Sequence, residues 1–235
     1  MSLQIGLLAF PNVQQLDLTA PYEVFAMIPG ATVHLVAAGL EPIVSATGLV
    51  LTPTVRMADC PALDVLCVPG GVGVNALMTD REVLAFVRER AAAARFVTSV
   101  CTGALVLGAA GLLRGRRATT HWASLDLLAA FGAIPVAERV VRDGNLLTGG
   151  GVTAGIDFAL TLAAELAGPP AAEAIQLGLE YAPAPPFGAG TPAGAGPAVL
   201  ATVRGRLAAG RAERERIVGA ITGATGIVPW APAGP

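Results

Sequence analysis

Short apolar runs alternate along the N-terminal part of the chain with longer stretches in which apolar residues recur at helical spacing. The short runs are typical of buried strands and the longer stretches of helices. Strands are expected at residues 4–10, 32–38, 65–68 and 96–100, and helices near residues 21–28 and 81–94. This alternation predicts an α/β fold, a doubly wound, mostly parallel sheet of the flavodoxin-like kind with helices on both faces.

The rest of the chain predicts a hairpin, a further pair of strands and four more helices. A segment at 43–55, broken by Gly48 and Pro53, predicts a hairpin, and Asp143-Gly144 predicts a turn between strands at 139–142 and 145–148. Helices are expected at 105–113, 152–166, 171–181 and 198–221, with Pro169-Pro170 ending one of them and the Arg and Glu residues of the last on its solvent face. We expect residues 1–187 to form one catalytic domain, with 188–235 as a loop and C-terminal helix packed on it.

Composition narrows the class of protein. Hydrophobic residues make up 54% of the 235 residues and charged residues 14%, which excludes a disordered chain, and no apolar run is long enough for a membrane span. The net charge is −2 and every cation is Arg, so a nucleic-acid partner is not expected. Three cysteines without metal-type spacing, and an N-terminus without a signal-peptide pattern, predict a cytoplasmic protein with reduced thiols.

The candidate nucleophile is Cys101. The strand at 96–100 runs directly into Cys101-Thr102-Gly103, after which a helix follows with almost no loop. Small residues two positions away on either side, Ser99 and Gly103, match the spacing of a nucleophile elbow. The helix N-terminus there would favour a thiolate and lower the pKa of Cys101. The alternative is that Cys101 is an ordinary small core residue.

A candidate acid precedes the first helix. Asp17 is expected in the loop after the first strand, above the same sheet edge as Cys101, where a carboxylate can exchange a proton with a thiol. The alternative is that Asp17 only stabilises the dipole of a helix starting near Pro21. Glu23 is the rival carboxylate.

Two glycine turns follow strands at this edge. In Pro69-Gly70-Gly71-Val72-Gly73, small residues let backbone N–H groups approach a ligand, and the turn lacks the Gly-Lys-Ser/Thr ending of a phosphate loop. Gly149-Gly150-Gly151 closes a further strand and is expected to be either a hinge or a simple turn.

These residues together resemble the ThiJ/PfpI (class I glutamine amidotransferase-like) superfamily, and within it the branch that hydrates isocyanides. The motifs that carry the resemblance are Leu16-Asp17-Leu18-Thr19-Ala20-Pro21, Val68-Pro69-Gly70-Gly71, Val100-Cys101-Thr102-Gly103, Ala118-Thr119-Thr120-His121-Trp122, Gly149-Gly150-Gly151-Val152-Thr153-Ala154-Gly155-Ile156-Asp157 and Leu179-Glu180-Tyr181. Peptidases of the superfamily place a His directly after the Cys as general base. Thr102 stands there in this chain, which argues against peptidase activity.

The resemblance implies a hydro-lyase that adds water to an isocyanide through a cysteine thioimidate, giving an N-substituted formamide. Cys101 thiolate would attack the terminal carbon while Asp17 supplies its proton, and Thr102 would hold the attacking water or relay a proton. The implied pocket residues are Gly71, His121, Trp122, Gly150, Gly151, Val152 and Tyr181. No metal or organic cofactor is expected, and a homodimer is implied. Taken alone, His121 is more readily interpreted as a structural residue than as a pocket residue.

Two other classes of protein use the same elbow. One is a ligand or redox sensor without catalytic activity, although residues after 187 are too few for the DNA-binding domain that such regulators carry. The other is a glyoxalase or amidase-like relative.

Overall fold

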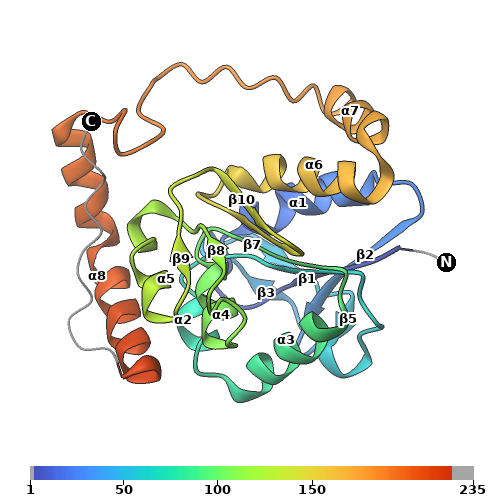
Figure 1. Ribbon diagram of the computed structural model, residues 1–235, viewed down its shortest axis with the longest axis horizontal. Coiled ribbons are helices and arrows are strands. Elements are labelled where there is room, and N and C mark those ends of the chain that lie inside the picture. The colour runs from blue at the N-terminus through green and yellow to red at the C-terminus, as the bar shows by residue number, and fades with distance from the viewer. Residues whose placement is uncertain (1–2, 224–235) are drawn as a thin grey trace.

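The computed structural model describes residues 3–223 and is built around a seven-stranded sheet (Figure 1). The strand order is β10-β11-β7-β6-β1-β2-β5, and every neighbouring pair is parallel except β10 and β11. The strands are β1 (Leu3–Leu8), β2 (Ala31–Ala37), β5 (Val55–Arg56), β6 (Val65–Val68), β7 (Phe96–Val100), β10 (Val140–Asp143) and β11 (Leu146–Gly149). The predicted α/β fold with a mostly parallel sheet is confirmed.

Two short pairs lie outside this sheet. The predicted hairpin is present as β3 (Ile43–Val44) paired antiparallel with β4 (Val50–Leu51). The second pair is parallel and consists of β8 (Arg117–Ala118) and β9 (Ile134–Pro135). The β8 strand leads into the Thr119–Trp122 stretch and so directs it toward the end of β7.

Helices cover both faces of the sheet (Figure 1). One face carries α1 (Gln15–Ala26) and α6 (Ala154–Ala167), which pack together through the edge-to-face rings of Phe25 and Phe158, 6.0 Å apart. The other carries α2 (Val74–Leu77), α3 (Arg81–Ala93) and α4 (Gly103–Ala109). The remaining helices are α5 (Leu127–Ala130), α7 (Pro169–Gly178), α8 (Pro197–Thr222) and the 3₁₀ turns η1 (Met57–Asp59) and η2 (Trp122–Ser124). All four residues of β6 are buried, as expected of a strand covered on both faces.

The start of the first helix differs from the prediction. We expected a helix from Pro21, with Asp17 in the loop before it, but α1 begins at Gln15 and Pro21 lies inside it. The extra turn is held by the loop after β6: Gln14 N–H donates to Gly70 O (2.9 Å), and Asp17 accepts from Gly70 N–H. The local proline signal was therefore overridden by a tertiary contact.

The predicted end of the helix before Pro169 is confirmed, since α6 ends at Ala167. Pro169 and Pro170 in turn open α7, because a proline costs little in the first turn of a helix. One expectation about the last helix was wrong. On α8 the Arg and Glu residues do not all face solvent: Arg214 is only 8% exposed and lies with Ile217 and Val218 on the buried face.

Through that buried face α8 packs against α5, η2 and α2, and so contacts the elements that surround the sheet (Figure 1). Within residues 3–223, none of the helices combines the length and apolar character needed to cross a bilayer.

Candidate active site

Cys101 occupies the elbow between β7 and α4, as its sequence context predicted. Its φ of 53° lies in the left-handed region, which costs a residue with a side chain about 1–2 kcal/mol. The neighbouring Gly103 makes the tight turn possible, because a Cβ there would collide with the carbonyl oxygen of Val68. Such strain persists only where the surrounding structure fixes it.

The backbone of Cys101 is fixed from both sides. Its N–H donates to the carbonyl oxygens of Gly149 (3.1 Å) and Gly150 (2.8 Å) at the end of β11. Its carbonyl oxygen accepts a hydrogen bond from Thr120 Oγ1 (2.6 Å). The second glycine turn and the Thr119–Trp122 stretch therefore both serve to hold the elbow in its left-handed conformation.

Asp17 is completely buried in the first turn of α1. Its Oδ2 accepts a hydrogen bond from Gly70 N–H at 3.0 Å, and its Oδ1 has no hydrogen-bond partner of normal geometry among residues 3–223. Burial raises the pKa of Asp17 to about 7, and the nearby Cys101 thiol and Gly70 amide only partly oppose this rise. The carboxyl can therefore hold or release a proton near neutral pH.

The predicted lowering of the Cys101 pKa is wrong. Burial, and then the negative charge of Asp17, raise the pKa of the thiol well above its usual value, although the Thr102 amide and Arg214 act in the opposite direction. The sequence argument considered only the helix N-terminus, whereas the desolvation of a thiol that is 6% exposed is the larger effect. Cys101 and Asp17 thus form a buried pair of acids that share protons.

Thr102 connects the elbow to the first glycine turn. Its Oγ1 accepts from Gly71 N–H (3.0 Å) and lies in position to donate to Gly71 O (3.2 Å). Gly70 is enclosed by the same groups: a Cβ there would lie 2.5 Å from Thr102 N and 2.8 Å from Asp17 Oδ2. Gly70 therefore lies against both Asp17 and Thr102, and the Gly71 N–H is already engaged by Thr102.

His121 and Trp122 lie close to the elbow. His121 Nδ1 accepts from Ala123 N–H (3.3 Å), and its ring is tilted against Trp122 with centroids 5.4 Å apart. Burial, assisted by the charge of Arg214, lowers the pKa of His121 to about 4. A neutral imidazole with one nitrogen already accepting is a weak base, which fits the structural reading of this residue. Gly151 faces the ring, since a Cβ there would lie 3.8 Å from His121 Cδ2.

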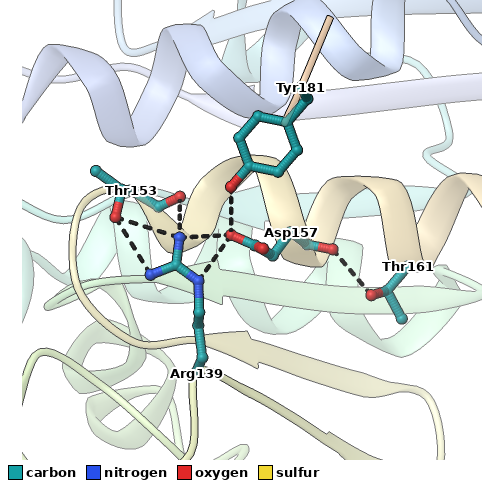
Figure 2. Close-up of polar contacts among 5 residues, drawn as sticks. All are labelled: Arg139, Thr153, Asp157, Thr161 and Tyr181. Carbon is teal, nitrogen blue, oxygen red and sulfur yellow. Dashed lines mark hydrogen bonds and ion pairs between the residues drawn. The ribbon is translucent and has the colours of Figure 1, made fainter. Parts of the chain in front are cut away.

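Tyr181 takes part in a surface network beside the second glycine turn (Figure 2). Its hydroxyl donates to Asp157 Oδ2 (3.0 Å) on α6, and Arg139 donates to the same oxygen and to Thr153. The Arg139 carbonyl in turn accepts from Gly150 N–H (2.9 Å). The network ties the start of α6 to the turn that holds Cys101, while Val152 packs half-buried against the core.

One charged residue near Cys101 was missed in the sequence. Arg214 on α8 acts electrostatically on both Cys101 and His121. A signal was present: Arg214 has no acidic residue three or four positions away, but has Ile217 and Val218 there, the pattern of a buried helix face.

A mostly apolar cavity of about 290 Å³ lies elsewhere, at the ends of β1 and β2. It is lined by Leu8, Phe10, Ala37, Ile43, Met57 and Val83, among others, and by none of the predicted site residues.

The fold and the elbow define a class of protein, the α/β sandwiches that present a cysteine between a buried strand and a helix. Within that class the chain belongs to the DJ-1/PfpI family, whose model matches residues 4–165.

Several relatives can be compared with it. The chain is 64% identical over 208 residues to isonitrile hydratase of Pseudomonas putida, covering 88% of this chain and 91% of that protein. A ThiJ/PfpI family protein from Pseudomonas syringae has a similar crystal structure, with a TM-score of 0.91 and 44% identity over 93% of this chain and 91% of that one. The transcriptional regulator GbdR of Pseudomonas aeruginosa is 31% identical over 67% of this chain but only 45% of its own length.

Proposed function

We propose that this chain is an isonitrile hydratase, a hydro-lyase that converts an organic isocyanide, R–N≡C, into the N-substituted formamide R–NH–CHO. The observation that carries the proposal is the close similarity to the Pseudomonas putida isonitrile hydratase along nearly the whole of both chains. The buried Cys101–Asp17 pair supports it, because the terminal carbon of an isocyanide needs both a nucleophile and a proton.

The first step adds the S–H group across that carbon. The Cys101 sulfur forms the S–C bond while the proton, passed through the Asp17 carboxyl, goes to the same carbon. The product is a thioimidate, R–N=CH–S–Cys101, and Asp17 is left as a carboxylate if it has given up its only proton. A pair that shares one proton between sulfur and carboxyl contains both reactants for this step.

Water completes the reaction. Asp17 takes a proton from a water molecule as the water oxygen attacks the thioimidate carbon, and passes that proton to the nitrogen. Collapse of the tetrahedral intermediate, R–NH–CH(OH)–S–Cys101, expels the Cys101 sulfur and releases R–NH–CHO, while the hydroxyl proton returns to the Asp17–Cys101 pair. Thr102, which contacts Gly70 and Gly71, positions the loop that hydrogen-bonds Asp17, and its hydroxyl is our candidate for holding the attacking water.

Para-substituted phenyl isocyanides provide the direct test, since formamide formation is followed by absorbance. We expect turnover by the wild type and by Cys60→Ala, which removes a buried thiol outside the site, and none by Cys101→Ala. Absence of turnover by pure wild-type protein would overturn the proposal, and isocyanide binding without turnover would favour a sensor.

Intact-protein mass spectrometry tests the covalent step. During slow turnover, the protein should gain the full mass of the isocyanide, because addition of S–H across the carbon loses no atom. Asp17→Asn should lower kcat about 10²–10⁴-fold, whereas Glu23→Gln, an exposed carboxylate on the same helix, should not. Equal activity in both variants would remove Asp17 from the mechanism.

We also propose that the protein works in the cytoplasm as a homodimer, with residues 1–187 as the catalytic domain and 188–235 packed on it. The three free cysteines support a reducing compartment, since the mechanism requires an unoxidised Cys101. Sedimentation equilibrium should give twice the 23.6 kDa chain mass.

A further inference from the structure

The apolar cavity of about 290 Å³ lies at the carboxyl ends of β1 and β2, the edge at which open α/β sheets bind ligands. Its floor consists of buried apolar side chains from β1, β2, β3, α2 and α3, namely Leu8, Ala37, Ile43, Leu77 and Val83. Because these side chains belong to the core, the cavity is already formed in the free protein. Its volume is close to the lower limit of small-molecule sites, which is roughly 300 Å³.

The rim of the cavity carries negative charge. Glu41 and Asp80 line it and are exposed, whereas no Arg does. Arg56, next to the wall residue Met57, pairs with Asp59 at the surface. Across residues 3–223, neither Glu41 nor Asp80 takes part in an ion pair. Two carboxylates without a cation therefore stand above an apolar floor.

The carboxylate of Asp80 is held in place by the helix that it caps. Its Oδ1 accepts hydrogen bonds from Glu82 N–H (2.9 Å) and Val83 N–H (3.1 Å) at the start of α3. Its Oδ2 accepts none from the described part of the chain, and Arg81, the first residue of α3, does not line the cavity. Because another rotamer would break both capping hydrogen bonds, Oδ2 stays at the rim and can accept from a ligand.

The two parts of the cavity select the chemistry of its ligand. The apolar floor favours an apolar group, and the carboxylates favour a positive charge and repel a negative one. A divalent metal ion fits poorly, because it needs more oxygen ligands than two, and the described residues contain no group of three or more His, Cys, Asp or Glu that could hold one. An organic ammonium ion with one compact apolar group satisfies both parts.

The cavity is distinct from the site around Cys101. Phe10 lines the cavity, and its ring lies against Gly73, where a Cβ would be 2.8 Å from the ring. Gly73 belongs to the first glycine turn, which hydrogen-bonds Asp17 through another residue. The Phe10 ring therefore lies between the cavity and this turn, and neither Cys101 nor Asp17 lines the cavity.

We propose that this cavity is a second binding site, which takes a small organic ammonium ion. The apolar group of the ligand fills the space above the buried floor, and Glu41 and Asp80 stabilise its charge. The proposal does not depend on the isocyanide chemistry, because it uses none of the residues of that mechanism. Cys101→Ala should bind the same ligand with unchanged affinity.

The experiment is a titration of the ¹⁵N-labelled full chain, followed by amide chemical shifts, with three probes of similar size: 2-phenylethylammonium, neutral 2-phenylethanol and anionic 3-phenylpropionate. We expect saturable shifts with the ammonium ion at the amides of Gly39, Glu41, Asp80 and Val83. The alcohol should bind about tenfold more weakly, since it lacks both charge contacts, and the anion should not bind.

Variants assign the binding to the two parts of the cavity. Glu41→Gln and Asp80→Asn, which keeps a capping side chain, should each weaken ammonium binding about threefold, and the double variant about tenfold. Glu23→Gln, an exposed carboxylate that does not line the cavity, is the matched control and should bind as the wild type does. Ala37→Leu, which fills the cavity, should abolish binding.

Four results would overturn the inference: no saturable binding of the ammonium ion, equal affinity for the alcohol, shifts confined to residues outside the cavity, or full affinity in the double variant. If Ala37→Leu does not fold, as judged by circular dichroism, the charge variants decide the question without it. Since no readout uses an isocyanide, loss of the proposed hydratase activity would leave this result unchanged.

Discussion

The carboxyl of Asp17 is buried, and its protonation is therefore linked to folding. In the unfolded chain its pKa is 3.8, and in the folded protein burial raises the pKa to about 7. The folded state binds the proton more tightly, so Asp17 contributes most to stability below pH 3.8, and this contribution is lost as the pH rises through about 7.

Asp17→Asn should remove this dependence, because asparagine does not ionise. Between pH 4 and 7 the free energy of unfolding of the wild type should fall relative to that of the variant by about 1.4 kcal/mol per pH unit, and level off above. Urea unfolding at several pH values measures the difference. The low pKa of His121 affects both proteins equally and cancels in the comparison. Parallel curves of unfolding free energy against pH for the two proteins would contradict a raised pKa of Asp17 in the folded state.

Gly70 is the point at which the acid, the elbow and the first glycine turn meet. In Gly70→Ala, the new Cβ would lie 2.5 Å from Thr102 N and 2.8 Å from Asp17 Oδ2, so the elbow and α1 must move apart. We expect a loss of about 1–3 kcal/mol in stability and a large fall in turnover. Gly39→Ala is the control, since no atom lies within 4 Å of its Cβ position. Equal melting temperatures and activities in the two variants would contradict this account.

At the scale of the elements, α8 is held to the η2–α5 segment by the nearly buried ion pair between Arg211 and Asp126. The Asp126 side chain is only 8% exposed where it meets Arg211, so removing the guanidinium leaves a nearly buried carboxylate unpaired. Arg211→Met should therefore destabilise the protein by roughly 3 kcal/mol. Arg216→Met, in an exposed pair, should change stability by less than about 0.5 kcal/mol. Thermal unfolding distinguishes the two, and equal effects would mean that the Arg211 pair does not hold the helix.

The strands and most helices were predictable because their signals are local. The runs at 65–68 and 96–100 coincide with β6 and β7, and α3 ends within one residue of its predicted end. Asp80, which caps α3 by accepting from Glu82 and Val83 N–H, shows why: the residues that define the helix start are adjacent in sequence. The elbow was predictable for the same reason.

What sequence did not reveal depends on contacts between distant elements. The start of α1 is fixed by Gly70, which is more than fifty residues away. The direction of the pKa shift at Cys101 depends on burial by the whole fold, and Tyr181 hydrogen-bonds Asp157 because α7 turns back beside α6. Arg214 becomes buried only once α8 is docked.

For the molecule as a whole, the packing of α8 predicts a single unfolding unit. Its buried face contacts η2 and α5 beside the elbow and α2 below the sheet, so it should not melt separately. Differential scanning calorimetry should show one transition whose calorimetric and van't Hoff enthalpies agree. A separate low-temperature transition, removed by truncation after residue 187, would instead make residues 188–235 an independent appendage.

The docking of α8 also affects biosynthesis. Cys101 leaves the ribosome more than one hundred residues before Arg214. The N-terminal sheet can form first and bury the thiol in its protonated state, in which it is poorly reactive toward oxidants. Only when the final helix closes onto the finished core does Arg211 meet Asp126, so the segment beside the elbow is secured last.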